Sequence, residues 1–355
     1  MPMLAAALVL VLSALVVPRS TQSSWSTAPD MPSPGTEQLA TVLQDGRVLV
    51  TGGEEVTDGL PVARSQVYDP HTQTWSYTQP MHVGRIGDTA TMLRDGRVLL
   101  VGGLGPHLHG LASTELFDPG SGTWSRAAPL PETRFSQSAS PLPGGRVLVV
   151  GGIVAGTISR KTEVYDPASG RWTRGADTNF AHAQQTALPL RRGRILVLGG
   201  YGGGPEVYDP LKKRWSRAGL TAFRAHPIIT VLSDGSVLVA AGTSAKYRDL
   251  RSSRVFSPST GRWMPAGRLR TPRNDAVGML LPSGHVLAAG GQQVTMHVLR
   301  SAELYNPATR SWSATAPMLE PRDDATAALL PDKTVLVCGG MNLTGVLSSC
   351  ETYHP

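Results

Sequence analysis

All seven tryptophans of this 355-residue chain fall at the same point of one repeated unit. Successive members lie 43 to 50 residues apart: Trp25, Trp75, Trp124, Trp172, Trp215, Trp263 and Trp312. A fixed period of this length indicates one supersecondary unit copied seven times. The repetition therefore overrides the two or three separate domains that length alone would suggest.

Two other markers follow the same period. An aromatic residue stands two positions before a proline in every copy, at Tyr68, Phe117, Tyr165, Tyr208, Phe256, Tyr305 and Tyr353. A glycine pair ends an apolar run in six copies: Gly52, Gly53, Gly102, Gly103, Gly151, Gly152, Gly199, Gly200, Gly290, Gly291, Gly339 and Gly340. The fifth copy has Ala241 and Gly242 at these positions.

Each copy predicts four short strands. A tight turn such as Asp45-Gly46 separates the first strand from a second strand, which is apolar throughout and is therefore expected to be buried on both faces. The third strand ends at the aromatic-x-Pro step, and the fourth carries the tryptophan. The 39 glycines and 28 prolines agree with a turn-dense, all-β protein.

The glycine pair, the aromatic residue about fourteen positions later and the tryptophan seven beyond it resemble the kelch repeat. The form is the long one found in bacterial proteins and in the galactose oxidase propeller. The resemblance covers about residues 22–355 and implies a seven-bladed β-propeller, as a single domain over residues 21–355. Trp25 precedes the first full copy and the last copy lacks a tryptophan, so residues 24–28 are predicted to complete the seventh blade beside residues 348–353.

The N-terminus carries an uncharged apolar run over residues 3–17. Fifteen residues rise only about 22 Å as a helix, which is short of a bilayer. We therefore expect a signal peptide over residues 1–20, an exported protein (secreted, periplasmic or cell-surface) and no membrane span after its removal. A buried N-terminal segment is the alternative.

A basic position recurs thirteen residues before the second-strand valine or isoleucine. In a propeller this loop opens on the face around the central channel, so the sequence predicts a cationic ring suited to carboxylates. In kelch adaptors that bind acidic peptides, the arginine at this motif position lines the pocket. The predicted ligand-binding ring is Arg85, Arg134, His182, Arg224, Arg273 and Arg322.

A structural role is the alternative for this ring. Five third strands carry a glutamate two residues before the aromatic, and each could pair with an arginine inside the blade: Glu115, Glu163, Glu206, Glu303 and Glu351. Arg254 replaces the glutamate in the fifth copy, so Arg224 is expected to lack such a partner.

Catalysis has weaker support. Copper oxidation of the galactose oxidase kind needs two tyrosines, two histidines and a thioether-forming cysteine near the axis, which this sequence does not supply. His107 and His109 are interpreted as solvent-exposed, and neither a metal nor another cofactor is predicted. Exported kelch propellers include sialic-acid epimerases, for which the candidate acid–base residues are Glu37, Glu54, Glu55, Asp88, Asp275 and Asp324.

The two cysteines, Cys338 and Cys350, fall at facing ends of neighbouring strands and are candidates for a disulfide in an oxidising compartment. The basic clusters at residues 191–194 and 211–214 lie in turns without interleaved aromatic residues, so they are interpreted as solvated surface and no nucleic acid is predicted.

The sequence thus predicts an exported, monomeric interaction module. Its expected ligand is a protein or an acidic carbohydrate or peptide, bound at the loop face around the channel. The alternatives are an epimerase or mutarotase acting on an acidic sugar, and a structural role without a ligand.

Overall fold

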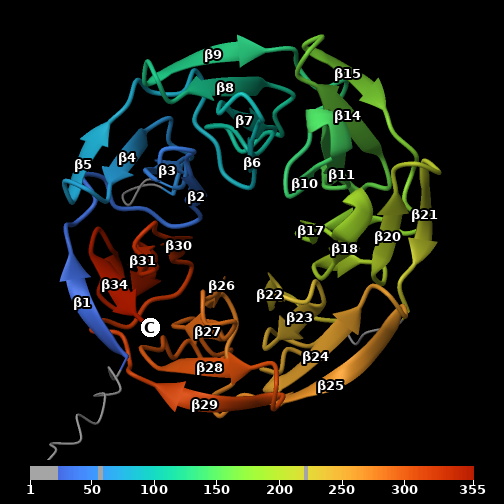
Figure 1. Cartoon of the computed structure of the whole chain (residues 1–355). Helices are drawn as coiled ribbons and strands as arrows, with labels where there is room; N and C mark the ends of the chain where they lie inside the picture. The colour runs from blue at the N-terminus through green and yellow to red at the C-terminus, as the bar shows by residue number, and fades with distance from the viewer. Residues whose placement is uncertain (1–22, 55–58, 220–222) are drawn as a thin grey trace, which may run out of the picture.

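A computed structural model describes residues 23–54, 59–219 and 223–355. Seven four-stranded antiparallel sheets stand around a central axis, which confirms the all-β, seven-bladed propeller (Figure 1). The predicted signal peptide lies outside the described residues. Within the described ranges, no helix is long and apolar enough to cross a membrane.

In six blades the strands run from the axis outward in chain order, and in the seventh blade the outermost strand is β1. The innermost strands are β2 (Leu39–Val42), β6 (Thr89–Met92), β10 (Ser138–Pro141), β17 (Thr186–Pro189), β22 (Ile228–Val231), β26 (Val277–Leu280) and β30 (Thr326–Leu329). The second strands are β3 (Val48–Thr51), β7 (Val98–Val101), β11 (Val147–Val150), β18 (Ile195–Leu198), β23 (Val237–Ala240), β27 (Val286–Ala289) and β31 (Val335–Cys338).

The outer half of each blade follows the same order. The third strands are β4 (Ser65–Asp69), β8 (Thr114–Asp118), β14 (Thr162–Asp166), β20 (Glu206–Asp209), β24 (Ser252–Ser257), β28 (Ala302–Asn306) and β34 (Cys350–His354). The outermost strands are β5 (Thr74–Tyr77), β9 (Thr123–Ala127), β15 (Arg171–Arg174), β21 (Arg214–Arg217), β25 (Arg262–Arg268), β29 (Ser311–Thr315) and β1 (Ser24–Ala28). Three short strand pairs lie in loops: β12 (Ile153–Val154) with β13 (Thr157–Ile158), β16 (His182–Ala183) with β19 (Tyr201–Gly202), and β32 (Met341–Asn342) with β33 (Gly345–Val346). Two 3-10 turns, η1 (Pro143–Gly145) and η2 (Arg191–Gly193), lie in hairpins.

The hydrophobic core lies between the blades. Every residue of the seven second strands is buried, as their continuous apolar sequence predicts. Each of the seven buried clusters combines side chains of two neighbouring blades, for example Leu238 with Leu269 of the fifth blade and Val286 with Tyr305 of the sixth. Burial of these faces against one another fixes each blade by its two neighbours.

The tryptophans join neighbouring blades at the perimeter. Each stacks on the aromatic residue of its own third strand, with ring centroids 5.0 to 5.2 Å apart. Each indole also donates a hydrogen bond to the preceding blade, as Trp215 Nε1 does to Ala176 O at 2.8 Å. This double contact explains the recurrence of tryptophan once per repeat.

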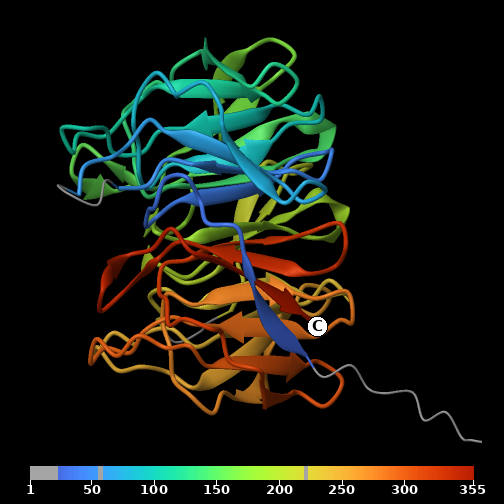
Figure 2. The same cartoon turned by 90° about the vertical axis from the view of Figure 1, so that its left-hand side faces the viewer.

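The ring closes as predicted. β1 pairs along its whole length with β34, from Ser24 opposite His354 to Ala28 opposite Cys350 (Figure 2). In the same blade Cys338 on β31 lies directly opposite Cys350 on β34, and their sulfur atoms are bonded. The last blade is thus held both by a strand from the start of the chain and by a covalent link.

Candidate functional site

The arginines of the predicted ring do not line the mouth of the channel. We call their place in each repeat the strut position: Arg85, Arg134, His182, Arg224, Arg273 and Arg322. All six side chains are buried, and five of them are at most 1% exposed. Each arginine turns into its own blade, where Nη1 donates to the carbonyl at the end of the second strand; Arg273 Nη1 lies 2.7 Å from Gly290 O. The expected cationic mouth is therefore wrong.

The strut side chains pair with the glutamates of the third strands. Arg85, Arg273 and Arg322 approach Glu115, Glu303 and Glu351 at 2.5, 3.2 and 2.9 Å, Arg134 lies 3.8 Å from Glu163, and His182 lies 3.1 Å from Glu206. Each pair is almost inaccessible to solvent. This is the arrangement that the structural alternative predicts, and it leaves these guanidinium groups no open face for a ligand.

The glycine pairs complete the connection between blades. The N–H of Gly291 donates to Arg322 O in the next blade at 2.9 Å. A Cβ on Gly290 would lie 2.4 Å from the same carbonyl oxygen. Because the backbones approach so closely, and both glycines have positive φ angles, only glycine fits here without displacement.

Arg224 in the fifth blade differs from the other arginines. It donates to Ala241 O, Ser252 O and Ser252 Oγ at 2.6, 3.0 and 2.8 Å, but no described carboxylate pairs with it. Burial and the nearby charge of Arg254 lower the pKa of Arg224 to about 10. The sequence-based expectation of a missing partner is met, yet this side chain too is buried.

The residue two positions beyond the strut, or beyond Gly35 in the first blade, lines a common cavity in five of the seven blades. We call this the mouth position, and its members are Glu37, Gly87, Ser136, Gln184, His226, Asp275 and Asp324. All seven have φ between 48° and 60°, the left-handed region that only glycine adopts freely. Three neighbouring pairs are joined through their backbones, as Ser136 N is to Gly87 O at 2.8 Å. This shared turn directs the chain from the buried strut to the start of the innermost strand.

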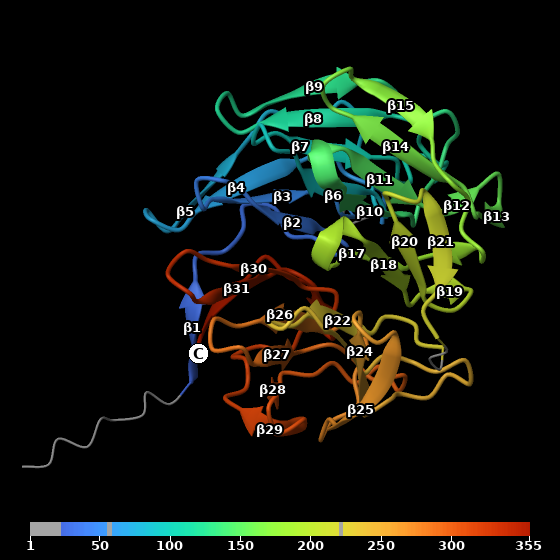
Figure 3. The same cartoon turned by 45° about the vertical axis from the view of Figure 1, so that its right-hand side comes forward.

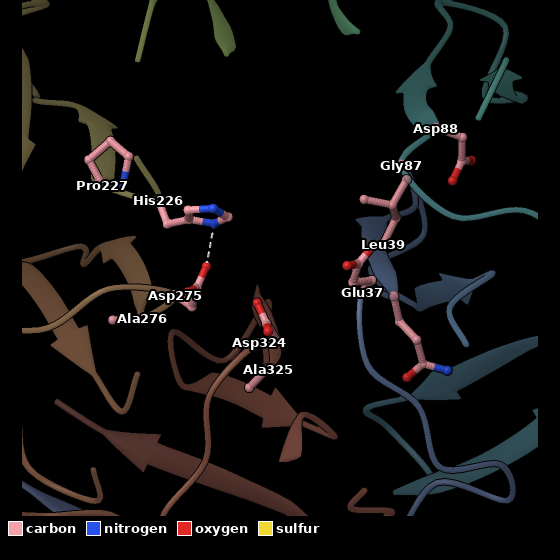
Figure 4. A pocket seen from close by; sticks show the side chains of 11 residues that line it. Glu37, Leu39, Gly87, Asp88, His226, Pro227, Asp275, Ala276, Asp324 and Ala325 are labelled. Carbon is pink, nitrogen blue, oxygen red and sulfur yellow. Dashed lines mark ion pairs between the residues drawn. The ribbon is translucent and has the colours of Figure 1, made fainter. Parts of the chain in front are cut away.

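A cavity of about 390 Å³ opens among these residues, and its ionisable lining residues are Glu37, Asp88, His226, Asp275 and Asp324. His226, Asp275 and Asp324 lie on one side of it, and Glu37 and Asp88 on the other (Figure 4). His226 Nδ1 is 2.5 Å from Asp275 Oδ1. The mouth is therefore acidic.

Four of the six predicted acid–base candidates line this cavity. Of the other two, Glu54 forms a backbone bridge with Pro61 outside this lining, and Glu55 lies outside the described residues.

Burial is the main cause of the raised pKa values of carboxyl groups at the mouth, and repulsion between carboxylates adds to it at Asp324. Burial, with the charges of Asp275, Asp323 and Glu37, raises the pKa of Asp324 to about 7. Burial raises the pKa of Asp323 and of Asp88 to about 6. The hydrogen bond with Asp275 raises the pKa of His226. Among the described lining residues, His226 is the only one whose side chain can carry a positive charge.

Asp88 shows that the acidic lining lacks partners. Its side chain belongs to a residue only 8% exposed, and Oδ2 has no hydrogen-bond partner. A buried carboxylate oxygen without a donor is costly and is unusual in folded proteins. An external donor entering the cavity would satisfy it.

The mouth does not fit a copper site of the galactose oxidase kind. Its lining offers one imidazole, no phenol and no thiol, and both cysteines form the disulfide. Tyr201 and Tyr247 lie exposed in outer loops. Within the described ranges, no three His, Cys, Asp or Glu side chains are grouped to hold a metal, and His107 and His109 are exposed.

Exposed apolar residues surround the mouth on the loops between second and third strands. We call them the apolar crown: Leu108, Ile158, Tyr201, Tyr247, Met296 and Leu343, which are 40 to 86% exposed. Figure 3 shows two of these loops, with β12–β13 and β19, projecting beyond the blades. Sequence reasoning overlooked the crown because its members differ in type from blade to blade.

Three crown residues share one strained turn. Leu108, Tyr247 and Met296 each occupy the fourth place of a five-residue hairpin, with φ of 55°, 51° and 61°. In each hairpin the crown residue N–H donates to the carbonyl of the first residue, as Tyr247 N does to Ser244 O at 2.9 Å. Glycine or asparagine would relieve the strain, and a polar side chain would suit the exposure.

A family model for the Kelch motif matches residues 134–179. No curated protein matches the chain in sequence. Among solved structures, a fungal alcohol oxidase of the AA5 family in complex with copper superposes with a TM-score of 0.77 over 94% of this chain and 76% of the oxidase, at 22% sequence identity. At this identity the likeness concerns the fold. Together with the seven repeats and the seven sheets, these matches show a seven-bladed β-propeller that contains a kelch motif over residues 134–179.

Proposed function

We propose that this protein is an interaction module whose loop face receives a protein partner, with a basic side chain of that partner inside the acidic mouth. The observation that carries the proposal is the cluster of four carboxylates around one cavity, one of them buried with an unpaired oxygen. The kelch propeller fold supports an interaction module in general terms, and the carboxylates of the mouth indicate that its ligand is basic.

Charge favours a basic ligand over the acidic one that the arginine ring predicts. The guanidinium groups are inside the blades, while Glu37, Asp88, Asp275 and Asp324 face the cavity. An ammonium or guanidinium group there would offset the burial and the repulsion that raise the pKa of Asp324, and would donate hydrogen bonds to more than one carboxylate.

The apolar crown favours a protein over a small cation. A small amine would contact only the mouth and leave the crown exposed. Aromatic and methionine side chains are enriched in protein interfaces, where a central charged anchor is commonly surrounded by contacts that exclude water. Tyr247 and Met296, which are 82% and 69% exposed, are placed for such contacts.

Selection of peptides from a random display library tests the proposal. The wild type is expected to enrich peptides in which lysine or arginine is flanked by apolar residues. The double variant Asp275→Asn with Asp324→Asn should lose this enrichment, because both substitutions remove charge from the mouth.

The matched control is Asp45→Asn with Asp95→Asn, which removes two exposed carboxylates from hairpins at the other end of the innermost strands. This control should enrich the same peptides as the wild type. Enrichment of acidic peptides by the wild type, or of the same basic peptides by the mouth variant, would contradict the proposal.

Acid–base catalysis is a second candidate, favoured by one observation. His226 paired with Asp275 and the raised pKa of Asp324 place titratable groups near neutrality in one cavity. The buried arginines supply no anchor for an acidic sugar, so a substrate would be neutral or basic. Conversion of neutral or amino sugars, followed by NMR and abolished by Asp324→Asn, would favour this candidate over simple binding.

Export is also a proposal. It is supported by the apolar run over residues 3–17 and by the disulfide between Cys338 and Cys350, a bond that persists in oxidising compartments. Mass spectrometry of material from the producing cells should show loss of about the first 20 residues and no free thiol. An intact N-terminus would contradict export by a cleaved signal peptide.

A further inference from the structure

A second cavity lies between the fourth and fifth blades, at the opposite ends of the strands from the mouth. Its volume is about 630 Å³, and four turns line it. These turns are residues 191–194 and 209–211 of the fourth blade, and residues 234–236 and 257–259 of the fifth. The cavity shares no lining residue with the mouth, so what it binds is independent of the function proposed above.

The hairpin of the fourth blade departs from its equivalents. In the first two blades an aspartate at this turn pairs with the arginine two residues later: Arg47 with Asp45 at 2.8 Å and Arg97 with Asp95 at 2.7 Å. In the fourth blade Arg192 takes the place of the aspartate. A carboxylate that neutralises an arginine is thus replaced by a second positive charge.

Arg194 is consequently left without a carboxylate partner in the described part of the chain. Its Nη2 donates to Pro258 O at 3.2 Å, across the boundary between the two blades. Its Nε is buried and has no hydrogen-bond partner. A buried guanidinium N–H without an acceptor is costly, and an anion in the cavity would supply one.

The other arginines of the hairpin stand at the same opening. Arg192 has a φ of 62°, where the third blade has Gly144 at 87°, so the backbone of Arg192 adopts a conformation that favours glycine. Arg191 lies against the neighbouring turn, its Nε only 2.9 Å from the place that a Cβ on Gly235 would take. Glycine at residue 235 therefore leaves room for this guanidinium.

The carboxylates of the cavity are already engaged with their own turns. Asp209 Oδ1 accepts from the N–H groups of Leu211 and Lys212 at 3.0 and 3.1 Å. Asp234 Oδ1 accepts from Ser236 N and Oγ at 2.8 and 2.6 Å. Burial alone would raise the pKa of Asp234, but these bonds and the charge of Arg191 lower it. The three guanidinium groups outnumber the two carboxylates by one, and the mutually bonded hydroxyls of Ser257 and Ser259 leave one further hydroxyl hydrogen for a ligand.

We infer that this cavity binds a phosphate or sulfate group. Guanidinium groups recognise such oxyanions through paired N–H donors. A tetrahedral oxyanion has enough acceptor oxygens to engage several guanidinium groups and a serine hydroxyl together, whereas a carboxylate has only two oxygens. The unpaired Nε of Arg194 identifies one donor, and Arg191 and Arg192 supply the others.

Isothermal titration with sodium sulfate and with sodium phosphate, at constant ionic strength, tests this inference. Saturable binding of at least one ion by the wild type is expected. R192D should weaken it at least tenfold, because it restores the aspartate of the first two blades and neutralises Arg194. R192G places the glycine of the third blade at this position and should weaken ion binding less than R192D. It provides a second test of the site in case R192D folds poorly.

R171D is the matched control, because Arg171 is an exposed arginine on β15 that does not line the cavity. The affinity of R171D for either ion should stay within about twofold of the wild type. Equal weakening by R171D, or no saturable binding of either ion by the wild type, would overturn the inference. Phosphatidylcholine vesicles with and without phosphatidylserine separate a free oxyanion from a lipid headgroup. Binding to phosphatidylserine vesicles without binding of either free ion would also overturn it.

Discussion

Residues only two positions apart in this chain have opposite roles. Arg273 is buried and repeats with little change from blade to blade, whereas Asp275 faces the cavity and its equivalents include Glu, Gly, Ser, Gln and His. The left-handed turn between the strut and the innermost strand separates the two environments. Within such a repeat, the residue that recurs holds the ring together, and the residue that varies gives the mouth its chemistry.

The largest expected effect comes from removing a strut. Arg273→Met should lower the free energy of unfolding by about 3–5 kcal/mol, because Glu303 would be left buried without its partner. Denaturant unfolding measures the change, with the exposed Arg171→Met as control. A loss of unfolding free energy below about 1 kcal/mol would mean that the buried pair contributes little to stability. The contrast between the strut position and the mouth position would then not hold.

A smaller effect is expected from completing the deficient strut. Arg254→Glu places a carboxylate opposite Val239, at the register that Glu303 occupies opposite Ala288. The substitution removes a repelling charge and gives Arg224 an acceptor, so unfolding should require about 1–2 kcal/mol more. Thermal and denaturant unfolding of this variant beside Arg251→Glu, in the preceding loop, would show whether the gain is specific to the strut. Destabilisation by Arg254→Glu would show that Arg224 does not need a carboxylate.

The smallest expected effect concerns the mouth. The pKa of Asp324 in the folded protein is about 7, above its ordinary 3.8, so the folded state binds the proton more tightly than the unfolded state does. This group therefore favours folding most below pH 4, and its contribution is lost as the pH rises to about 7. Because Asp324 is partly exposed, solvent screens much of this effect. Asp324→Asn should be more stable than the wild type at pH 8, by about 1 kcal/mol, with the difference shrinking or reversing at pH 4. An equal difference at both pH values would contradict the repulsion described for the mouth.

Much of this fold follows from the sequence, because the features that recur are those that hold blades together. The tryptophans, the glycine pairs and the closing strand at Trp25 were all predictable from spacing. The strut arginines were predictable in position but not in direction: spacing places Arg322 at the channel end of the blade, whereas its side chain turns toward Gly339 and Glu351.

The site was less predictable for a physical reason. Glu37, Asp88, Asp275 and Asp324 were recognisable as candidates, but a surface carboxylate and a carboxylate at a shared cavity look alike in sequence. Their convergence comes from four different blades, up to 287 positions apart. The cluster at residues 191–194 posed the same difficulty, since only the structure shows that Arg194 has no carboxylate partner among the described residues.

The central claim is that the mouth binds a basic group, and the pH dependence of that binding tests it most directly. The affinity of a selected lysine- or arginine-containing peptide would be measured by calorimetry at pH 5.5 and pH 8, in buffers of different ionisation enthalpy. Asp324 and Asp88 must lose protons, and any charge on the His226 imidazole must be lost, for the mouth to reach its full negative charge. We predict tighter binding at pH 8 than at pH 5.5. The affinity should rise by up to about tenfold per pH unit for each proton that binding releases, and calorimetry should detect this proton release at pH 5.5. Binding that is tighter at pH 5.5, or unchanged with no proton release, would contradict the account.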